Sequence, residues 1–462
     1  MKKKAKRFLF FLIFIILVIG VVAIFSSNEK IYDLGYSILE PIFGENTKDI
    51  IGERPNNTPE IPNDSTNDEQ QKPNDSGSNN TETPPVGNTY EIVEEYVYED
   101  FQIHFIRMGN SSYSSDYSKY SGDSIYIQAN GNDILIDAGS RQGSAGYIKD
   151  YVDKYCKDGV LEYVIATHAD QDHISGFVGT NAYPGIFEAY KIETLIDFTY
   201  SDKDLTTSSG GQSLYGKYVE GRNQLLSNGT KCYTAKECFN EENGAKSKYS
   251  LGENISFEVI YNYYYFNKAS DENDHSVCTL FTYNNLNFLF TGDLEEKGEE
   301  KLAEYYDKST PEKTLPHCVL YKAGHHGSKT SSNDCLLDLI TPEICCVCCC
   351  AGSVEYTKNY KNVFPTQDFI NRIAKHTDRV YVTSVINEKT DEPEEMNGDI
   401  IISSNGIKVA IDATNNIIKL KDTEWFNETV YVKSDNTIAD KNGFFTSETA
   451  GVIAVKRRIW PI

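Results

Sequence analysis

The chain has 462 residues, with 68 Asp or Glu against 44 Lys or Arg, and its formal net charge at pH 7 is −24. Proteins that grip long nucleic acids rely on Lys and Arg contacts to phosphates, so this charge argues against a stable nucleic-acid complex. Hydrophobic residues make up 39% of the chain, which is enough for one large domain and a small appendage beyond a polar N-terminal region.

The first 25 residues have the pattern of a membrane anchor. Basic residues at positions 2–4, 6 and 7 precede Phe8–Phe25, an uncharged run built almost only from Phe, Leu, Ile, Val, Ala and Gly. At about 1.5 Å per residue, a helix of this length spans a bilayer, and its basic end is expected to stay in the cytoplasm. We predict a cytoplasmic tail at residues 1–7, a single-pass anchor in the cell membrane at 8–25, and an extracellular remainder. A signal peptide cleaved near Val21–Ala23 is the alternative.

Two segments are expected to separate the anchor from the folded part. Residues 26–43 form a membrane-proximal segment, and residues 44–89 are rich in Asn, Asp, Thr, Pro, Glu and Ser. The second composition cannot bury enough apolar surface to order itself, so we predict a disordered linker. A hydrolase-sized domain at 90–412 and a β-rich appendage at 413–462 are predicted to follow.

From residue 90 onward, short apolar runs typical of strands alternate with stretches of helical periodicity. The predicted strands are Ile125–Gln128, Ile134–Asp137, Val164–Thr167, Leu195–Phe198, Phe257–Tyr261, Cys278–Tyr283, Phe288–Thr291, Val319–Lys322, Ile344–Cys349 and Val380–Thr383. The predicted helices are Tyr147–Tyr155, Gln212–Asn228, Glu295–Tyr306, Asn333–Ile340 and Thr366–Lys375. This alternation predicts an α/β fold of the αββα sandwich type, with two sheets packed between outer helices.

The C-terminal part is predicted to be β-rich. Asp399–Ser403 and Ile407–Asp412 are expected to finish the sheet of the main domain, and Ile417–Leu420 alternates in the same way. Trp425–Ile462 is predicted to form a separate appendage. Its basic residues Lys456–Arg458 indicate either a contact with an anionic polymer or a solvated strand edge.

Eleven cysteines are unusual in a domain predicted to lie outside the cell. Five of them fall within Cys345–Cys350, where successive side chains of a strand point to opposite faces and cannot converge on one ion. We predict a strand in which Cys serves as a small apolar residue. Cys232 and Cys238 flank a short loop and are the best candidates for a disulfide.

The most informative segment is Thr167–Gly176, where an apolar strand ends in residue types that bind metals. It places His168, Asp170, Asp172 and His173 within six positions. Imidazole and carboxylate together suit zinc, with manganese or iron as alternatives. A plainer interpretation is also open, in which the acids cap the next helix and the histidines are solvated.

Later motifs supply further ligand types at strand ends. Asp293 follows an apolar run, so its carboxylate is expected at the same sheet edge and is our candidate for a bridging ligand. His325 and His326 follow another apolar strand in a turn flanked by glycines, which allow the backbone to approach a site closely. One of these two histidines is expected to complete a second metal site. His275 is either a further ligand or the polar entrance to a strand.

Taken in order, these blocks resemble the metallo-β-lactamase fold superfamily, and within it the extracellular hydrolase domain of ComEC-type DNA-uptake proteins. The matching blocks are Gly122–Ser124 with Ile134–Gly139, the signature loop Thr167–Gly176, Asn273–Ser276 with Thr291–Asp293, and His325–Thr330. The resemblance runs from about residue 100 to residue 412 and implies the αββα fold and a dinuclear centre.

The resemblance also assigns the ligands. His168 and Asp170 would bind the first of two divalent ions, Asp172 and His173 would bind the second, and Asp293 would bridge them. The ions would be zinc, with manganese as the alternative.

Three more residues are assigned in the same way. Either His325 or His326 would join the second site. Asp137 would hold the signature loop without binding metal, although a carboxylate that only ends a strand is an equal alternative.

The chain departs from the family pattern at two positions. Asp170 stands where many members of the superfamily carry His, which matches the ComEC-like branch and makes the first site harder and more tolerant of manganese. Phe364–Pro365 stands where the ComEC-like pattern has a His-Pro pair, which puts in doubt whether the family's phosphodiester chemistry is kept unchanged.

The implied function is a hydrolase whose two metal ions activate a water, on a phosphodiester of DNA or of a cell-wall polymer. Asp172 would orient the hydroxide, and whichever of His325 and His326 is not a ligand would stabilise negative charge or protonate the leaving group. The alternatives are an esterase for cell-wall phosphoesters, such as teichoic-acid decorations, and a tethered binding module without catalysis. The negative net charge favours a small or wall-bound substrate.

Overall fold

The computed structural model describes residues 90–108, 122–306, 313–387, 390, 392–439 and 451–461. These residues belong to one compact unit, Pro85–Ile462. The predicted cytoplasmic tail, membrane anchor, membrane-proximal segment and linker lie outside the described residues. Among the helices that are described, none is both long and apolar enough to cross a bilayer.

The larger sheet has nine strands and combines an antiparallel half with a parallel half. In spatial order the strands are β1 (Ile92–Glu94), β17 (Val409–Ala413), β16 (Ile400–Ser404), β2 (Phe101–Phe105), β3 (Ile125–Ala129), β4 (Asn132–Ile136), β5 (Val160–Ile165), β6 (Lys191–Asp197) and β7 (Lys231–Thr234). Strands β4 to β7 run parallel, and the register places Ile136 beside Ile165. Because β4 and β5 end side by side, Asp137 and the signature loop leave the sheet at the same edge.

The second sheet has eight strands, and its parallel part carries the later motifs. In spatial order the strands are β15 (Glu392–Glu395), β14 (Val380–Asn387), β13 (Ile344–Ala351), β12 (Leu320–Lys322), β11 (Leu286–Phe290), β10 (Thr279–Tyr283), β9 (Ile255–Val259) and β8 (Lys248–Gly252). Strands β11 to β14 are parallel neighbours. Their carboxyl ends therefore bring Asp293 and the two adjacent histidines to one edge of this sheet.

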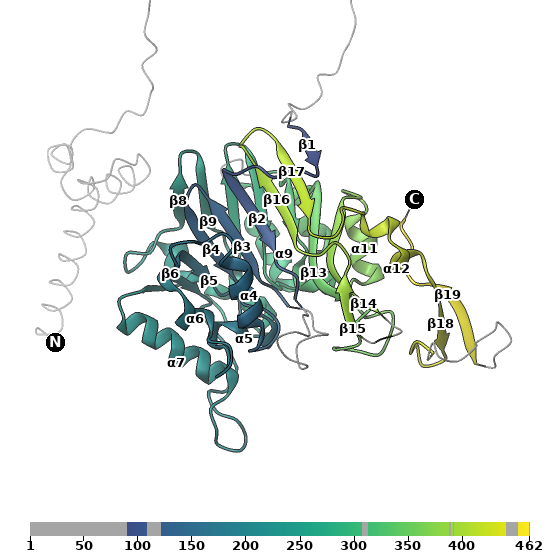
Figure 1. The fold of residues 1–462 in the computed structure, drawn as a ribbon, viewed down its shortest axis with the longest axis horizontal. Helices are drawn as coiled ribbons and strands as arrows, with labels where there is room; N and C mark the ends of the chain where they lie inside the picture. Colours follow the sequence, from purple (N-terminus) through teal and green to yellow (C-terminus); the bar gives the residue numbers. More distant parts are fainter. Residues whose placement is uncertain are drawn as a thin grey trace, which may run out of the picture. The chain divides into compact units, whose positions relative to one another are not determined.

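The two sheets pack face to face, and helices cover their outer faces (Figure 1). Between the sheets, the Phe101 ring of β2 lies 5.0 Å from the Phe288 ring of β11, and Phe105 lies 6.3 Å from Phe290. Two mixed sheets with outer helices confirm the predicted α/β fold. The covering helices are α4 (Ser144–Val152), α5 (Gln171–Val178), α6 (Ile186–Ala189) and α7 (Leu214–Ser227) on the larger sheet, and α9 (Glu296–Tyr305), α10 (Asp334–Ile340) and α11 (Gln367–Ile373) on the other.

All five predicted helices are present, and their ends differ from the prediction by at most three residues. The predicted strand at Ile417–Leu420 is wrong. The buried side chain of Asn397 donates to the carbonyl oxygens of Asn416 (3.0 Å) and Ile418 (2.9 Å). These two carbonyl oxygens would otherwise accept hydrogen bonds from a neighbouring strand. The chain instead turns into a short 3-10 helix, η6 (Leu420–Asp422).

The cysteine-rich strand β13 is buried along its whole length between two parallel neighbours, as predicted for a strand with small apolar side chains on both faces. Cys346 lies in the core between the sheets, and Cys345 lies in the core beneath the helices. The predicted Cys232–Cys238 disulfide is wrong, because all eleven cysteines are free. Cys238 Sγ lies 3.4 Å from the Tyr249 hydroxyl, whereas Cys232 Sγ donates to a different partner, the Thr230 carbonyl.

The C-terminal residues form a small two-stranded sheet of β18 (Thr429–Lys433) and β19 (Val452–Lys456), preceded by α12 (Glu424–Asn427). The sequence suggested that the basic residues ending this region contact an anionic polymer or form a solvated strand edge. Both interpretations are wrong for Arg457 and Arg458, which are each only 3% exposed. Both guanidinium groups stack on Trp425, at 5.4 and 5.5 Å from its ring centre. Arg457 pairs with Glu428 at 2.8 Å, so these charges are used inside the fold.

Candidate metal centre

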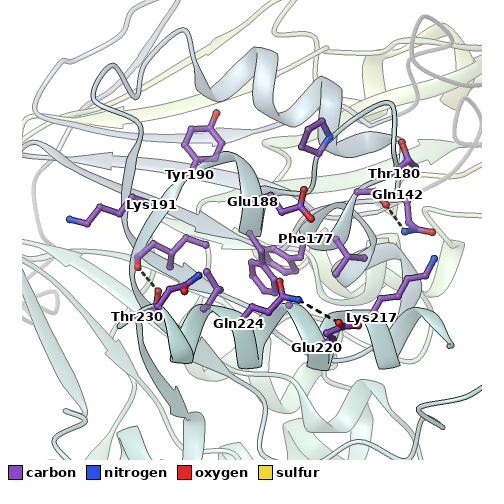
Figure 2. A pocket seen from close by; sticks show the side chains of 18 of the residues that line it. Gln142, Phe177, Thr180, Glu188, Tyr190, Lys191, Lys217, Glu220, Gln224 and Thr230 are labelled. Atoms are coloured by element: carbon purple, nitrogen blue, oxygen red, sulfur yellow. Dashed lines mark hydrogen bonds between the residues drawn. The ribbon is translucent and has the colours of Figure 1, made fainter.

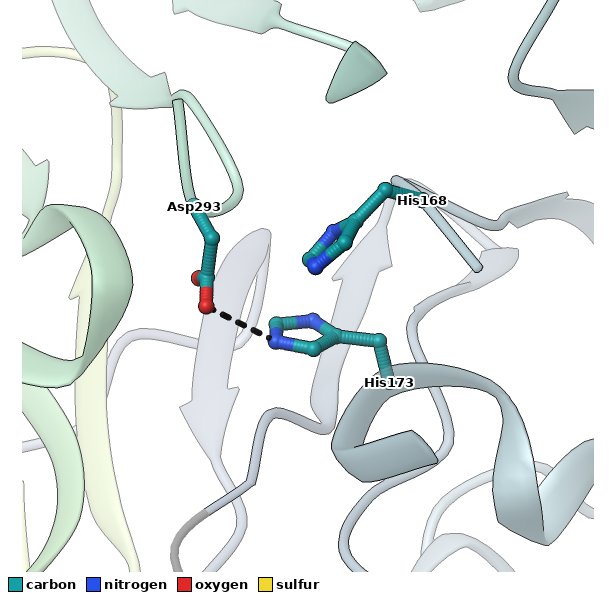
Figure 3. A group of neighbouring side chains, drawn as sticks. All are labelled: His168, His173 and Asp293. Atoms are coloured by element: carbon teal, nitrogen blue, oxygen red, sulfur yellow. Dashed lines mark hydrogen bonds and ion pairs between the residues drawn. The ribbon is translucent and has the colours of Figure 1, made fainter. Parts of the chain in front are cut away.

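Strand ends from both sheets deliver candidate ligands to one place (Figure 3). His168 follows β5, and His173 lies in the first turn of α5. Asp293 follows β11 of the other sheet. The rings of His168 and His173 are 4.1 Å apart, and His173 Nε2 is 3.1 Å from Asp293 Oδ2. All three side chains are buried, so the group lies at the junction of the two sheets, screened from bulk water.

His326, which follows β12, joins the same group. Its Nε2 lies 3.2 Å from Asp293 Oδ2 and 3.3 Å from Asp172 Oδ2. Two of the four overlapping trios are His168 with His173 and Asp293, and Asp172 with His173 and His326, and within each the ligand atoms lie within 4.8 Å of one another. Because the trios share His173 and Asp293 touches both imidazoles, they form one contiguous cluster.

Hydrogen bonds on the far side of each ring orient these imidazoles. His173 Nδ1 donates to Asp137 Oδ2 at 2.7 Å, and His326 Nδ1 donates to the backbone carbonyl of Cys348 at 2.9 Å. In its neutral form, each ring presents the lone pair of its Nε2 toward the Asp293 carboxylate. Two acceptors repel unless a proton or a cation lies between them, and this is how histidine ligands are arranged around metals.

Burial and charge at the cluster fit a divalent cation. The Nε2 atoms of His168 and His326 are buried and form no hydrogen bond within the described residues. Burial by itself would lower the pKa of His173 and of His326, but the neighbouring carboxylates, above all Asp293, raise both pKa values well above the usual value. The negative electrostatic potential of these carboxylates, which favours protonation of the two imidazoles, also favours a bound cation. Imidazole and carboxylate ligands together suit zinc or manganese.

Asp137 ties the signature loop to the end of β4. Its Oδ1 accepts a hydrogen bond from the Thr167 amide at 2.8 Å, and its Oδ2 accepts from the Thr167 hydroxyl and from His173 Nδ1, both at 2.7 Å. The residue has a left-handed backbone, with φ of 58°, which turns the chain sharply where the strand ends. Asp137 therefore fixes both the loop backbone and the orientation of one candidate ligand.

Two buried charged residues at the centre were not singled out from the sequence. Asp123 Oδ1 lies 3.2 Å from His326 Nδ1, and Lys322 forms an ion pair with Asp123 and another, at 3.3 Å, with Asp293 Oδ1. Burial would lower the pKa of Lys322, but the two carboxylates raise it, so the ammonium stays charged. The sequence held one signal for Lys322, because this lysine ends an otherwise apolar strand just before the two adjacent histidines.

Three predicted candidates lie outside the ligand trios. Asp170 forms an ion pair with Lys203 at 2.5 Å, and its other oxygen is 3.7 Å from His168 Nε2. His275 is buried between the rings of Tyr200 and Tyr264, at 5.9 and 6.4 Å. The third candidate, His325, directs Nδ1 toward Glu295 Oε1 at 3.2 Å.

Aromatic side chains border the centre beside Asp172 and the histidine pair. The Tyr356 hydroxyl donates a hydrogen bond to Asp172 Oδ2, and its ring lies 5.4 Å from Phe364. Phe364 in turn lies 5.7 Å from the His325 ring and 6.0 Å from the His326 ring. Phe364, which stands where the resemblance leads one to expect His, thus packs against the histidine pair as an apolar wall.

A separate hollow of about 1540 Å³ lies between α6, β6 and α7 (Figure 2). Phe177 and Phe187 lie among its lining residues, as do Lys217 and Glu220. It shares no residue with the ligand trios. Phe177 lies at the C-terminal end of α5, whereas His173 lies in the first turn, so this hollow is distinct from the metal centre.

Comparison with known proteins relates part of this arrangement to one family. Residues 118–179, which contain Asp123, Asp137, His168 and His173, match the profile described as "Metallo-beta-lactamase superfamily". This segment of the chain is similar to the metallo-beta-lactamase superfamily. The trios of the centre combine residues of this segment with Asp293 and His326, which lie beyond it.

The chain is also a distant homologue of ComEC-type proteins, as the sequence blocks indicated. It is 35% identical over 109 residues to "Competence protein ComA" of Neisseria gonorrhoeae, which covers 24% of this chain and 14% of that protein. It is 26% identical over 226 residues to "Recombination protein 2" of Haemophilus influenzae, covering 48% and 22% respectively. The chain thus matches less than a quarter of each relative. Among solved structures it is similar to the metallo-beta-lactamase fold protein YhfI of Bacillus subtilis, with a TM-score of 0.33 and 8% identity over 62% of this chain and 96% of that one.

Proposed function

We propose that this chain is a metal-dependent phosphodiesterase. The observation that carries the proposal is the buried convergence of His168, His173 and His326 on the carboxylate of Asp293. Two divalent ions held there would lower the pKa of a shared water and neutralise charge on the scissile phosphoryl group. His168, Asp293 and His326 follow three different strands, and His173 lies in α5. The site therefore depends on the folded domain.

Individual residues would have distinct tasks. Asp293 contacts both His173 and His326, and is placed to bridge two ions. Asp172 has 14% of its side chain exposed, so it can reach a water at the open side of the cluster and orient it. Lys322 would keep its ion pair with the second oxygen of Asp293 and offset part of the negative charge of the ligands.

Two substrate classes follow from different observations. The two relatives are named for competence and for recombination, which makes DNA the first substrate to test. The net charge of −24 opposes the binding of long duplexes, which favours a second candidate, a phosphodiester or phosphoester of a cell-wall polymer. Hydrolysis of both classes should be compared with the same preparation.

We also propose that the N-terminal apolar run holds the domain on the outside of the cell membrane. Its support is the basic start at positions 2–4, 6 and 7, followed by the uncharged Phe8–Phe25. Protease added to intact cells should digest the domain, and mass spectrometry of the purified chain should recover residues 1–25. Loss of those residues would instead establish a cleaved signal peptide.

The direct test measures metal content and turnover of bis-p-nitrophenyl phosphate on the full chain. Wild type should bind close to two divalent ions per chain and hydrolyse the ester. Asp293→Ala and His173→Ala should lose metal and turnover together. His317→Gln is the matched control, because His317 lies before β12, at the end opposite His326, and is paired with Glu343.

The outcomes separate the alternatives. A metal-free and inactive wild type would overturn the proposal in favour of a tethered binding module. Bound metal without turnover of the ester or of either natural substrate class would leave a metal centre but reject phosphodiester hydrolysis. Equal loss of turnover in the His317 variant would show that the assay reports folding instead of the centre.

A further inference from the structure

The segment between β13 and α11, residues 352–366, borders the open side of the metal centre, and we call it the rim loop. It contains no helix or strand of its own. The rim loop carries Tyr356, whose hydroxyl reaches Asp172, and Phe364, which packs near His326. A substrate approaching Asp172 therefore meets this loop first, and the position of the loop has to come from contacts outside it.

Arg458 supplies three of those contacts. Its guanidinium donates to the carbonyl oxygens of Pro365 (2.8 Å), Val363 (2.8 Å) and Tyr360 (3.1 Å), all in the rim loop. The side chain is buried, and its fourth hydrogen bond goes to the carbonyl of Arg457. Burying a guanidinium among neutral carbonyls is costly, and only the planar fork of arginine can serve several of them at once.

Two other parts of the C-terminal region hold the same loop. The Tyr360 amide donates to the Asn436 carbonyl at 3.0 Å, and Asn359 forms an isolated antiparallel bridge with Thr437. At the start of the loop, Gly352 has φ of 83°, and a Cβ there would lie 2.7 Å from Trp425 Nε1. The rim loop is thus fixed at its beginning, middle and end by one region of the chain.

We propose that the C-terminal region contributes to the active site through Arg458, the positioning residue that holds the rim loop and Tyr356 over the metal centre. Arg458 acts through the loop and does not touch the reacting atoms. The aromatic surface of Tyr356, which is 49% exposed, and Phe364 would then form the wall that contacts substrate beside the metals. This inference rests on the proposed hydrolase function, and it assigns a role to a region that would otherwise be a detached appendage.

The test compares Arg458→Lys, which keeps the charge but loses the fork, with Arg457→Lys on the full metal-loaded chain. Arg457 is equally buried and stacks on the same Trp425, but its ion pair is with Glu428 in the appendage. Arg458→Lys should lower kcat/KM for a nitrophenyl phosphodiester by about 10- to 100-fold through misplacement of the loop. Metal content should stay at the wild-type value, and Arg457→Lys should remain within about twofold of wild type.

A double-mutant cycle separates positioning from a general loss of stability. Combined with Tyr356→Phe, Arg458→Lys should cost less than the sum of the two single effects, because both remove the same contact to Asp172. Full additivity, or equal losses in the Arg457 and Arg458 variants, would overturn the inference.

Limited trypsin digestion gives a measurement that does not depend on turnover. Lys358 and Lys361 are exposed within the rim loop. Arg458→Lys should accelerate cleavage at both sites, whereas Arg457→Lys should not. Unchanged cleavage in the Arg458 variant would reject the positioning role even if the wild type hydrolyses phosphodiesters. Accelerated cleavage together with an inactive wild type would reject the proposed function and leave only the positioning of the loop.

Discussion

Replacing Lys322 by Met tests the electrostatics of the centre most directly. The side chain is 1% exposed, and its ammonium contacts Asp123 and Asp293, whose side chains are 1% and 3% exposed. Met keeps the length of the apolar stem but leaves two buried carboxylates without their cation. Removing one partner of a buried pair typically costs about 3–5 kcal/mol, so we expect the free energy of unfolding of the metal-free protein to fall by that amount.

The assay is urea unfolding of the full chain in a chelator, followed by circular dichroism, with Lys149→Met as the control. Lys149 pairs with Asp153 at the surface, where the two side chains are 38% and 43% exposed, and losing such a pair costs about 0–1 kcal/mol. Saturating zinc or manganese should restore part of the loss in the Lys322 variant, because a bound cation takes over the neutralisation of Asp293. If the Lys322 variant in chelator is no less stable than the control, the account of the buried charges is refuted.

Four further predictions follow from the same structure. Asp137→Asn should weaken metal affinity by about 10- to 100-fold, measured by competition with a chelating dye, because the support of one ligand is lost. Burial lowers the pKa of His104 to about 3, so the neutral ring stabilises the fold above pH 6.5 and this contribution is lost as the pH falls toward 3; His104→Gln should flatten the stability profile in that window. Gly176→Ala should reduce both solubility and metal content, because a Cβ would lie 2.3 Å from a backbone carbonyl oxygen at the end of β4. In the native state, a thiol reagent should label only Cys232 and Cys335, and their slow reaction should reflect raised pKa values of about 11 and 12.

Each of these four predictions has its own contradicting result. Unchanged metal affinity in the Asp137 variant would show that the ligand loop holds itself. An unaltered pH profile in the His104 variant would assign the acid sensitivity to other groups. A soluble Gly176 variant with full metal content would show that α5 can shift without cost, and rapid labelling of more than two thiols would contradict the burial of β13.

Local patterns in the sequence determined the secondary structure and the residue types of the centre. Helical periodicity placed α7, α9 and α10 to within a few residues, because an amphipathic pattern depends only on near neighbours. The same local reasoning found His168 and Asp293, since each comes shortly after an apolar strand, and it found His173 in the same segment as His168. A strand that ends in ligand residues delivers them to a sheet edge whatever the rest of the fold does.

Adjacent histidines show where local reasoning stops. His325 and His326 both have left-handed backbones, with φ of 45° and 55°, yet their rings go to different places. His326 enters the cluster because the Cys348 carbonyl in the neighbouring strand accepts its Nδ1 hydrogen. His325 turns to Glu295 instead. The sequence left this choice open, because the deciding partner belongs to another strand.

Buried charges were decided by the tertiary structure alone. Lys322 ended a strand and Arg458 ended a basic run, and both patterns are equally typical of solvated residues. Arg458 is buried because backbone carbonyls accept four hydrogen bonds from its guanidinium, three of them in the rim loop, where Pro365 lies 93 residues away in the sequence. A charged side chain can leave water only where partners replace its hydration, and those partners come together only when distant segments of the chain have packed.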